Sequence, residues 1–424
     1  MTSSPVVDLR DYRSFCFRGE GQANLVISAK HAATGSRIAK SERVNKYMER
    51  IITPFIEPQF RVNPHIVELK IRDVHHLAKV PSLPADEKVE TFDELVQLPD
   101  ELSFLPFSAI PKGTKRLGCL QMLDATSIPN TVLTKTENTI TIEVKPKQGF
   151  FQNHPNFNVP YCNNCILQIE KCGSGRFSEM YDFCPLDLYS GNYGRMRHSL
   201  ESLFRDPHRN LRVFVNGYLV HCDKKTVEQS DFDETFFPDR RAKLDDLYHA
   251  LCLVLSGSDE NSPFQLHDSS VLGQILTAQK IDSIGLGRAF SLYNALPGNV
   301  KAEILDKTRL ARKGLDAILS PAKNDAQNLI ERYLVSATMK DCSIMVSLKL
   351  VSPSSGEYPS DVVTLANGTR FAYSIKIVDL DPKTPKHIQN AYTRLSAGLK
   401  ILRIGIEQGV RRKPCVPPES VENV

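Results

Sequence analysis

A pair of lysines that follows a predicted β-strand has the types and spacing of an anion-binding site. Residues 139–145 alternate aliphatic with polar side chains, and this period of two predicts a strand with one apolar face. Pro146 cannot donate a hydrogen bond to a neighbouring strand, so strand pairing should stop there and leave Lys145 and Lys147 free to reach into a cleft. The alternative is an ordinary polar strand face with solvated lysines.

Three aspartates in the C-terminal third stand out, and two of them have the spacing of a metal site. Asp341 lies where a predicted helix, opening near residue 325, gives way to a strand. Asp379 and Asp381 follow a predicted hairpin around the Asn-Gly pair at 367–368, and they share one face by the period of two. Mg²⁺ prefers oxygen ligands and bridges nucleotide phosphates, so the carboxylates of Asp379 and Asp381 predict a magnesium site. For an isolated Asp-x-Asp, a solvated turn is the alternative.

A glycine-containing turn near the N-terminus could contact phosphate groups. Residues 16–40 read as short strands, and their first turn contains Arg18, Gly19, Glu20, Gly21, Gln22, Ala23 and Asn24. Glycines let backbone amides approach a phosphate closely, but a Gly-x-Gly alone is also typical of a hairpin turn. The turn therefore indicates nucleotide binding only in combination with the other motifs.

Several blocks of this sequence resemble the inositol-pentakisphosphate 2-kinase family. Residues 143–147 are similar to its Glu-x-Lys-Pro-Lys signature, and the turn at 18–24 is similar to its nucleotide-covering loop. Residues 184–191 resemble its Asp-Pro-Leu-Asp-Leu-Phe-Ser-Gly segment, with a cysteine in place of the first aspartate. Residues 340–345 resemble its Ala-Lys-Asp-Cys-Ser-Ile-Met motif, with Thr-Met before the lysine, and the strand at 211–217 also matches.

The resemblance covers about residues 18–383 and implies a two-lobed, kinase-like α+β fold, with a small N-lobe and a larger C-lobe that carries an α-rich inositol-phosphate-binding insertion. It implies an enzyme that uses ATP and Mg²⁺ to phosphorylate the 2-hydroxyl of inositol 1,3,4,5,6-pentakisphosphate, giving the hexakisphosphate, phytate. One alternative is a non-catalytic sensor or scaffold for inositol phosphates, against which the presence of both Asp341 and Asp379 argues. Another is an inositol polyphosphate kinase of other positional specificity, but the Pro-x-x-x-Asp-x-Lys-x-Gly motif typical of those kinases is not found in this sequence.

The resemblance also implies roles for individual residues. Asp341 and Lys145 are the expected catalytic residues, the aspartate orienting or deprotonating the 2-hydroxyl and the lysine lying near the transferred phosphate. The expected magnesium ligands are Asp341, Asp379 and Asp381. The expected ATP contacts are Gly19, Glu20, Gly21, Gln22, Ala23, Asn24, Arg37, Asp124, Glu143, Lys145 and Arg212. The expected inositol-phosphate contacts are Lys147, Lys171, Arg209, Lys383, His387 and Tyr392.

Some of these positions depart from the family pattern. Asp124 ends an apolar run that is consistent with a hinge strand beside adenine, although family members often carry other residues there. Arg209 stands where a substrate-contacting asparagine is expected. Beyond Lys383 the match weakens, so that the family's next arginine falls near 386–387 and its tyrosine near 391–392.

The expected domain organisation follows from the same blocks. A segment rich in Pro, Asp and Glu, residues 81–111, marks the predicted lobe boundary. The expected parts are an N-lobe with the nucleotide-covering loop over 1–105, central strands and the hinge over 106–160, an α-rich inositol-phosphate-binding region over 161–335, a catalytic and metal-binding part over 336–410, and a disordered tail over 411–424. Periodicity predicts helices over 242–255, 271–280, 287–296 and 301–319.

Composition limits the function without naming it. With 424 residues, 41% of them hydrophobic and 24% charged, the chain is ordinary for a globular enzyme with two lobes. The net charge is only +4, so no overall field indicates nucleic-acid binding, and an anionic ligand needs locally gathered Lys and Arg. The sequence has no apolar N-terminal segment and no run long enough to span a membrane. We therefore expect a monomer in the cytoplasm, the nucleus or both.

The ten cysteines are expected to be reduced thiols, because the chain shows no export signal. Cys162 and Cys165 form a Cys-x-x-Cys pair, and Cys172 and Cys184 could in principle complete a zinc site with four ligands. Plain thiols are the alternative. Some plant members of the family carry a different zinc site, but the corresponding residues 290–322 contain neither Cys nor His, so that metal is expected to be absent.

Overall fold

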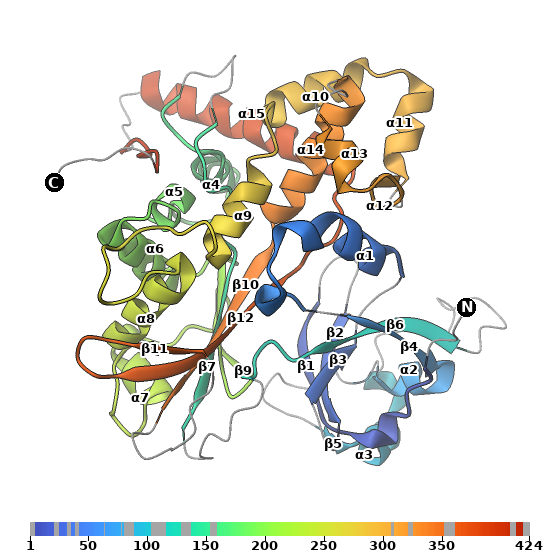
Figure 1. The fold of residues 1–424 in the computed structure, drawn as a ribbon, viewed down its shortest axis with the longest axis vertical. Coiled ribbons are helices and arrows are strands. Elements are labelled where there is room, and N and C mark those ends of the chain that lie inside the picture. Colours follow the sequence, from blue (N-terminus) through green and yellow to red (C-terminus); the bar gives the residue numbers. More distant parts are fainter. Residues whose placement is uncertain are drawn as a thin grey trace.

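The protein has a mixed α+β fold, and its described residues form two six-stranded sheets (Figure 1). The computed structural model describes residues 5–20, 25–31, 35–38, 42–62, 64–77, 79, 89–102, 116–128, 137–152, 159–306, 309–320, 325–351, 361–407 and 413–418. Between residues 12 and 44, at 66 and 102, and over 116–120, only the backbone is described. The expected α+β, kinase-like fold class is confirmed.

The N-terminal sheet has the strand order β4-β6-β3-β2-β1-β5, and its neighbours pair antiparallel. Its strands are β1 (Tyr12–Glu20), β2 (Leu25–His31), β3 (Gly35–Ile38), β4 (His65–Lys70), β5 (Val89–Thr91) and β6 (Arg116–Leu123). Two short helices, α2 (Ile71–Leu77) and α3 (Phe92–Gln97), accompany it. Because β6 pairs with β3 and β4, this sheet extends well past the lobe boundary predicted at residue 105.

A helical segment connects the N-terminal sheet to the rest of the molecule. α1 (Glu42–Tyr47) continues into a π-helical turn, Met48–Ile52, and two 3₁₀ turns, Thr53–Phe55 and Pro58–Phe60. The proline at residue 54 lies in the first turn of the segment Thr53–Phe55, where its missing backbone N–H removes no helical hydrogen bond. The buried Tyr47 hydroxyl lies 3.0 Å from the Thr338 hydroxyl, which ties this segment to the C-terminal lobe.

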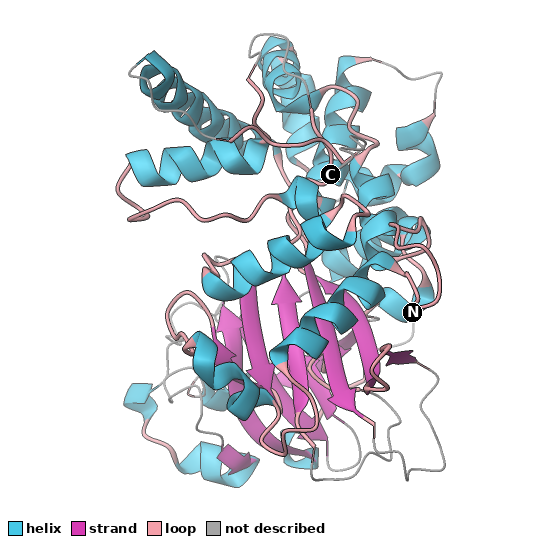
Figure 2. Cartoon of the chain, turned by 90° about the vertical axis from the view of Figure 1, so that its left-hand side faces the viewer, coloured by secondary structure: helices cyan, strands magenta, loops and turns pink. Residues whose placement is uncertain are grey.

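The C-terminal sheet has the order β11-β12-β10-β7-β8-β9, again antiparallel throughout. Its strands are β7 (Thr139–Val144), β8 (Leu211–Val215), β9 (Tyr218–His221), β10 (Ser343–Leu350), β11 (Val362–Thr364) and β12 (Arg370–Val378). Ile140, Ile142 and Val144 of β7 are buried in the main core, as their alternation predicts. α6 (Tyr193–Arg205) and α8 (Leu244–Ser256) add to that core, and Figure 2 shows helices lying across this sheet.

The remaining helices form a layer beyond the edge of the C-terminal sheet (Figure 1). A second buried cluster joins α4 (Asn163–Gly173), α10 (Gly285–Ala295), α14 (Ala326–Met339) and α15 (Pro385–Glu407). Three further helices lie between β7 and α10 in the described sequence: α5 (Pro185–Leu188), α7 (Phe232–Phe236) and α9 (Val271–Gln279). α8, α9 and α10 match the helices predicted from periodicity.

Two expectations from the sequence are wrong in this region. The single helix predicted over 301–319 is three short helices: α11 (Gly298–Leu305), α12 (Arg309–Lys313) and α13 (Leu315–Leu319). Gly314 separates the last two with a φ of 79°, a left-handed value that no helix interior can contain. The tail predicted to be disordered includes residues 413–418, which are described and pack against the protein through hydrogen bonds from Arg195.

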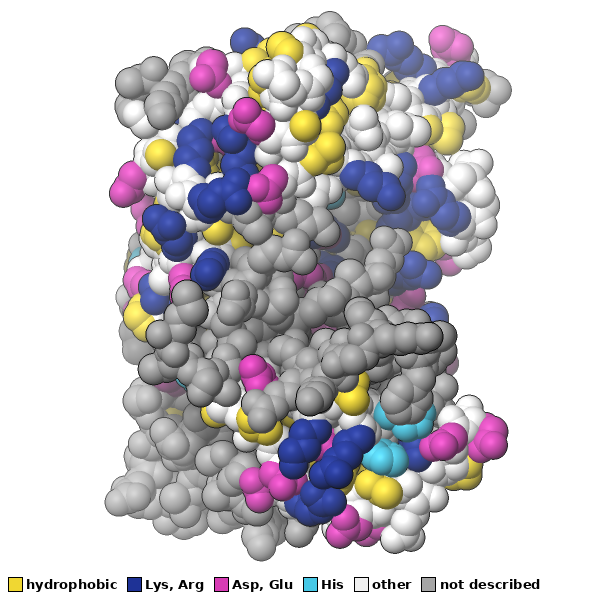
Figure 3. Space-filling view, turned by 90° about the vertical axis from the view of Figure 1, so that its right-hand side faces the viewer, with side chains coloured by type: hydrophobic (Ala, Val, Ile, Leu, Met, Phe, Trp, Pro, Cys, Tyr) yellow, Lys and Arg dark blue, Asp and Glu magenta, His cyan; other side chains and the backbone are white. Residues whose placement is uncertain are grey.

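The surface carries both signs of charge. On the face drawn in Figure 3, Lys and Arg side chains lie among Asp and Glu, in line with a net charge of +4. None of the helices in the described residues is long and apolar enough to cross a membrane.

Candidate active site

The ends of three adjacent strands bring the predicted catalytic residues together. Lys145 follows β7, Asp341 lies just before β10, and Asp379 follows β12. The register pairs the last residue of β7 with Ile344 and the last residue of β12 with Ser343. Because the pairs are antiparallel, the ends of β7 and β12 and the start of β10 share one edge of the sheet. The sheet itself therefore gathers these side chains.

Three lysines surround two of the predicted carboxylates. Lys145 Nζ lies 2.8 Å from Asp379 Oδ2. Lys147 Nζ lies 3.3 Å from Asp341 Oδ1, and Lys383 Nζ lies 2.6 Å from Asp341 Oδ2. We call these five residues the charged cluster. Its contacts unite residues that the sequence assigned to catalysis, metal binding and inositol-phosphate binding.

The charged cluster controls the protonation of its own members. Burial raises the pKa of Asp341, but the ammonium groups of Lys147 and Lys383 outweigh it and hold that pKa well below its usual range. Burial lowers the pKa of Lys147 and outweighs the attraction of Asp341. Burial also opposes the charge on Lys145, yet Asp379 raises the pKa of this lysine above its ordinary value. At neutral pH the cluster thus presents an ionised Asp341 beside a protonated Lys145.

Three predicted site residues have a left-handed backbone although none is glycine. The φ angles are 60° at Lys147, 63° at Arg209 and 63° at Asp379. Such conformations cost free energy, and they persist only where the surrounding structure imposes them. The fold therefore holds these residues in place at a cost, a pattern that is common at functional sites.

Gln279, at the end of α9, is a positioning residue that the sequence reasoning missed. Its amide nitrogen donates to the Lys147 carbonyl at 2.7 Å and to the Met339 carbonyl at 3.1 Å. Its amide oxygen accepts from the Gly149 backbone N–H at 2.9 Å. This fully buried side chain thus links the segment after β7 to the end of α14, just before Asp341. A glutamine within a predicted amphipathic helix gave no sequence signal of this role.

A second basic group lies beside the cluster, around the predicted substrate contact Lys171 at the end of α4. Burial lowers the pKa of Lys171 to about 8, and further lowering comes from the positive charges of Lys147, Arg394, Arg209 and Arg176. The Lys171 ammonium lies 4.5 Å from the centre of the Phe177 ring. We call Lys171, Arg176, Arg209 and Arg394 the basic group. An anionic ligand would relieve its internal repulsion.

Two members of the basic group, Arg176 and Arg394, were not predicted. Both pair with Glu170, Arg394 at 3.4 Å. Arg394 lies seven residues after His387 on α15, and this spacing places both on one face of the helix. Helical periodicity could therefore have identified Arg394, whereas Arg176 follows α4 in an irregular segment without such a signal.

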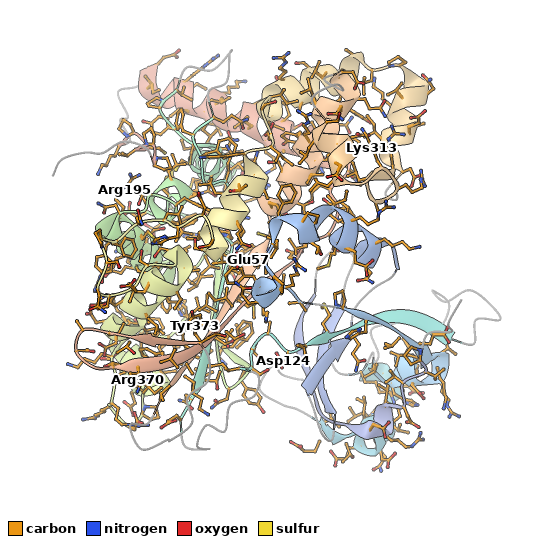
Figure 4. All side chains as sticks on the ribbon, in the orientation of Figure 1. Glu57, Asp124, Arg195, Lys313, Arg370 and Tyr373 are labelled. Carbon is orange, nitrogen blue, oxygen red and sulfur yellow. The ribbon has the colours of Figure 1, made fainter. Side chains whose placement is uncertain are left out.

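The predicted ATP contacts are only partly gathered. Glu143 and Arg212 face each other across β7 and β8, with Arg212 Nη1 3.5 Å from Glu143 Oε2. Asp124 lies between the two sheets (Figure 4), and its carboxylate accepts hydrogen bonds from the Thr126 backbone N–H at 2.8 Å and hydroxyl at 2.7 Å. The Asp124 side chain therefore serves at least in part to shape its own turn.

The predicted nucleotide-covering loop is described only at its margin. Gly19 and Glu20 end β1, opposite Val26 and Leu25 of β2. Arg37 lies on β3, where its backbone pairs with Ser28 and Met122, but its side chain is outside the described part. Gly21, Gln22, Ala23 and Asn24 also lie outside the described residues.

The remaining predicted contacts fall at different distances from the cluster. Burial, and after it the charge of Lys383, lowers the pKa of His387, so this histidine lies beside the cluster at the start of α15. Tyr392 instead stacks on Phe290 with ring centroids 3.9 Å apart, a contact within the helical layer. The Asp381 backbone carbonyl accepts from the Thr338 hydroxyl at 3.3 Å, which fixes the segment after β12.

The donor atoms of the cluster fit magnesium. Asp341 and Asp379 offer carboxylate oxygens, and each now pairs with lysine ammonium groups that phosphates could take over. Among the described residues, Asp341, Asp379 and Asp381 do not gather into a three-carboxylate cage. Mg²⁺ is usually held by one or two carboxylates together with water and substrate phosphates, so two carboxylates at the cluster suffice.

Comparison with known proteins agrees with the geometry. Residues 17–395 match the sequence family described as Inositol-pentakisphosphate 2-kinase. An inositol-pentakisphosphate 2-kinase of Danio rerio is 24% identical over 474 residues, covering 91% of this chain and 92% of the relative. One from Arabidopsis thaliana is 24% identical over 426 residues, with coverage of 91% and 92%, and one from Oryza sativa subsp. indica is 25% identical over 417 residues, with coverage of 88% and 89%. The chain belongs to the inositol-pentakisphosphate 2-kinase family.

Proposed function

We propose that this protein transfers the γ-phosphoryl group of ATP to the 2-hydroxyl of inositol 1,3,4,5,6-pentakisphosphate, giving the hexakisphosphate and ADP. The observation that carries the proposal is the charged cluster, in which Lys145, Lys147 and Lys383 surround Asp341 and Asp379. Phosphoryl transfer needs little covalent chemistry from a protein, and depends on positioning and on compensation of phosphate charge. Lysines and carboxylates on one sheet edge supply both.

The residues of the cluster divide these tasks. Asp341 accepts the proton of the 2-hydroxyl or orients that hydroxyl for attack, because it is ionised and sits at the centre of the cluster. Lys145 lies near the transferred phosphoryl group and stabilises its charge. Asp341 and Asp379, with Asp381 as a weaker contributor, would hold Mg²⁺, which would neutralise charge on the nucleotide phosphates.

The basic group binds the inositol phosphate. Lys171 and Arg209 belong to it, Lys147 and Lys383 contribute from the adjacent charged cluster, and His387 lies beside Lys383. Charge-assisted hydrogen bonds are each worth about 1.5–3 kcal/mol, so several of them would separate a pentakisphosphate from poorly phosphorylated inositols. We assign the nucleotide to the region of Glu143, Arg212 and Asp124, with Gly19 and Glu20 at the end of β1 as further contacts. A monomeric state and a cytoplasmic or nuclear location remain predictions from the sequence.

The test of this function is the variant Asp341→Asn. It removes one negative charge while keeping the size of the side chain, and we expect turnover to fall by about 10²–10⁴-fold. Calorimetric titration should show that binding of the pentakisphosphate is largely retained. Turnover near that of the wild type would remove Asp341 from the mechanism. Binding without turnover in the wild-type protein would instead favour a non-catalytic inositol-phosphate sensor.

A further inference from the structure

Two buried hydroxyl groups connect the helical segment after the N-terminal sheet to the edge where the charged cluster lies. The Tyr47 hydroxyl, at the end of α1, lies 3.0 Å from the Thr338 hydroxyl, near the end of α14. Both side chains are fully buried. The two residues are 291 positions apart in the chain, so only the tertiary fold brings them together. We call Tyr47 and Thr338 the hydroxyl pair.

Thr338 contacts both parts of the chain that carry the carboxylates of the charged cluster. Its hydroxyl donates to the Asp381 carbonyl at 3.3 Å, across 43 positions. Its backbone carbonyl accepts from the Asp341 backbone N–H at 3.1 Å. One residue therefore holds the backbone at Asp341 and the backbone of residues 379–383, which we call the Asp379 segment.

The protons of the hydroxyl pair define the direction of this chain of hydrogen bonds. A hydroxyl group has one proton to donate and two lone pairs that accept. When Thr338 donates its proton to the Asp381 carbonyl, Tyr47 is the donor to the Thr338 oxygen. Burial raises the pKa of Tyr47 far above its ordinary value, so its proton is present at neutral pH. Each bond in such a chain polarises and strengthens the next.

The alternative is that Thr338 serves only its own helix. Threonine within a helix often bonds to the carbonyl four residues earlier, and the Thr338 hydroxyl lies 3.4 Å from the Leu334 carbonyl. The contact with Asp381 is slightly shorter and leaves the helix. A purely local role also gives no reason for the Tyr47 hydroxyl to meet the same oxygen. The two roles predict different effects of substitution, as described below.

Apolar packing leaves room beside the Asp379 segment. Leu380 lines a pocket of about 360 Å³ together with residues of the helical segment, among them Met48, Ile52 and Phe60. A side chain that borders open space has fewer contacting atoms and is held less firmly by packing. The hydroxyl pair therefore carries more of the positioning on this side.

The Asp379 segment needs such restraint because its backbone is strained. Asp379 has a φ of 63°, a left-handed conformation that the surroundings must impose. Asp381 lies two residues later, and Lys383, which pairs with Asp341 at 2.6 Å, ends the segment. A shift of this segment would move all three side chains relative to Asp341.

We propose that Tyr47 and Thr338 are positioning residues that hold the Asp379 segment against the turn that carries Asp341, and so determine how tightly these carboxylates bind Mg²⁺. The hydroxyl pair acts through the backbone at Asp341 and Asp381. Figure 1 shows α1 between the N-terminal sheet and the helices of the C-terminal lobe, so the position of α1 would influence the metal site. The part of this proposal that concerns Mg²⁺ rests on the proposed function.

The first experiment compares Thr338 variants of the full-length protein. Mn²⁺ replaces Mg²⁺, and its binding in the presence of a non-hydrolysable ATP analogue is followed by electron paramagnetic resonance. Groups that orient metal ligands typically contribute 10–100-fold to affinity, so Thr338→Val should weaken Mn²⁺ binding at least about tenfold. Thr338→Ser keeps the hydroxyl and should bind Mn²⁺ nearly as the wild type does. Wild-type affinity in Thr338→Val, or no recovery in Thr338→Ser, would overturn the proposal.

Thr141 of β7 offers a matched control. Its side chain is also fully buried, and its hydroxyl lies 2.8 Å from the Ser347 hydroxyl and 3.4 Å from the Thr126 carbonyl, within the sheet. Thr141→Val removes the same group as Thr338→Val, so it should lower stability in chemical denaturation but leave Mn²⁺ affinity unchanged. Equal losses of Mn²⁺ affinity in the two variants would mean that Thr338 acts through general stability alone.

A second measurement needs neither metal nor activity, and a second variant keeps it decisive if Thr338→Val fails to fold. Hydrogen exchange of the amides in residues 379–384 is followed in the metal-free protein by mass spectrometry. These amides should exchange several-fold faster in Thr338→Val and in Tyr47→Phe than in the wild type and Thr338→Ser. Unchanged exchange in the variants without a hydroxyl would overturn the proposal.

The two measurements separate this proposal from the proposed function. A wild-type protein that neither binds Mn²⁺ with the nucleotide analogue nor transfers phosphate would contradict the proposed function. Faster exchange in Thr338→Val would still support the positioning role of the hydroxyl pair in that case. Tight Mn²⁺ binding and phosphoryl transfer that both survive Thr338→Val would leave the proposed function intact and contradict the positioning role.

Discussion

Lys171 should make inositol-phosphate binding depend on pH. Burial, together with the nearby positive charges, lowers the pKa of its ammonium group to about 8 in the free protein. A bound polyphosphate needs the charged form and would raise that pKa again, so affinity should fall as pH rises through 8. We expect about a tenfold weakening between pH 7 and pH 9, measured by calorimetric titration with the pentakisphosphate.

Two variants isolate the contribution of Lys171. Lys171→Arg keeps a charge that does not titrate in this range, so its affinity should be nearly independent of pH between 7 and 9. Lys171→Met should bind the pentakisphosphate more weakly but bind ATP as the wild type does. If Lys171→Met retained the wild-type affinity for the pentakisphosphate, this lysine would not be a substrate contact.

Asp379 and Asp381 should differ in their effect on magnesium. The Asp379 carboxylate belongs to the charged cluster, whereas the described contact of Asp381 with Thr338 is made by its backbone. We expect Asp379→Ala to raise the Mg²⁺ concentration needed for half-maximal turnover by more than about 100-fold, and Asp381→Ala by about 10-fold. Magnesium titrations of both variants provide the comparison. Small and equal shifts would mean that neither aspartate binds Mg²⁺ and that the pair belongs to an ordinary solvated turn.

At the scale of elements, α9 controls where the segment after β7 lies. Gln279→Leu would leave the Gly149 N–H and the Lys147 and Met339 carbonyls without their partner. An unsatisfied buried polar group costs about 1–3 kcal/mol, so the free energy of unfolding should drop by about 2–4 kcal/mol. Turnover should also fall, because Lys147 loses a contact that holds its left-handed backbone.

Gln274 of the same helix is a matched control for Gln279. Its side chain accepts from the Glu57 backbone N–H at 2.8 Å and donates to the Ser269 carbonyl at 2.8 Å, away from the charged cluster. Gln274→Leu should therefore lower stability in chemical denaturation while leaving turnover of the folded protein nearly unchanged. Equal losses of turnover in the two variants would mean that Gln279 acts through general stability alone.

Local patterns in the sequence predicted much of the C-terminal sheet and its helices. The alternation at Ile140, Ile142 and Val144 and the helix start near residue 325 are signals within one element, and the structure contains both β7 and α14 where these signals place them. The family resemblance implied a shared site for Asp341 and Asp379, and the pairing of β10 with β12 places both residues at one edge of the sheet. Local pattern thus suffices where an interaction partner is near in the chain.

Contacts between distant residues could not be predicted in the same way. Gln279 reaches Lys147 across 132 positions, and Cys415 reaches Cys162 across 253. The periodicity of a single helix or strand contains no information about contacts between residues so far apart in the chain. The pairing of β6 with β3 and β4 is likewise set by the packing of the whole N-terminal sheet, so the predicted lobe boundary fell too early in the chain.

At the scale of the whole molecule, the fold gathers positive side chains at one place although the chain has little net charge. A chain with a net charge of only +4 gathers Lys145, Lys147, Lys171 and Lys383, with several arginines, on one side of a sheet edge. Carboxylates compensate part of this charge in the free protein, as in the pair of Lys147 with Asp341. A polyphosphate and magnesium can replace these internal pairs, which makes the ligand part of the final charge balance.

The most direct test of this account uses inositol pentakisphosphates that each carry one free hydroxyl, at different ring positions. With ATP and Mg²⁺, each isomer can be phosphorylated at one position only, so relative kcat/KM values report which hydroxyl meets Asp341. We predict that the 1,3,4,5,6-isomer, with its free 2-hydroxyl, is converted to the hexakisphosphate at least about 100-fold more efficiently than the others. Preference for another isomer, or tight binding of all of them without transfer, would contradict the assignment as a 2-kinase.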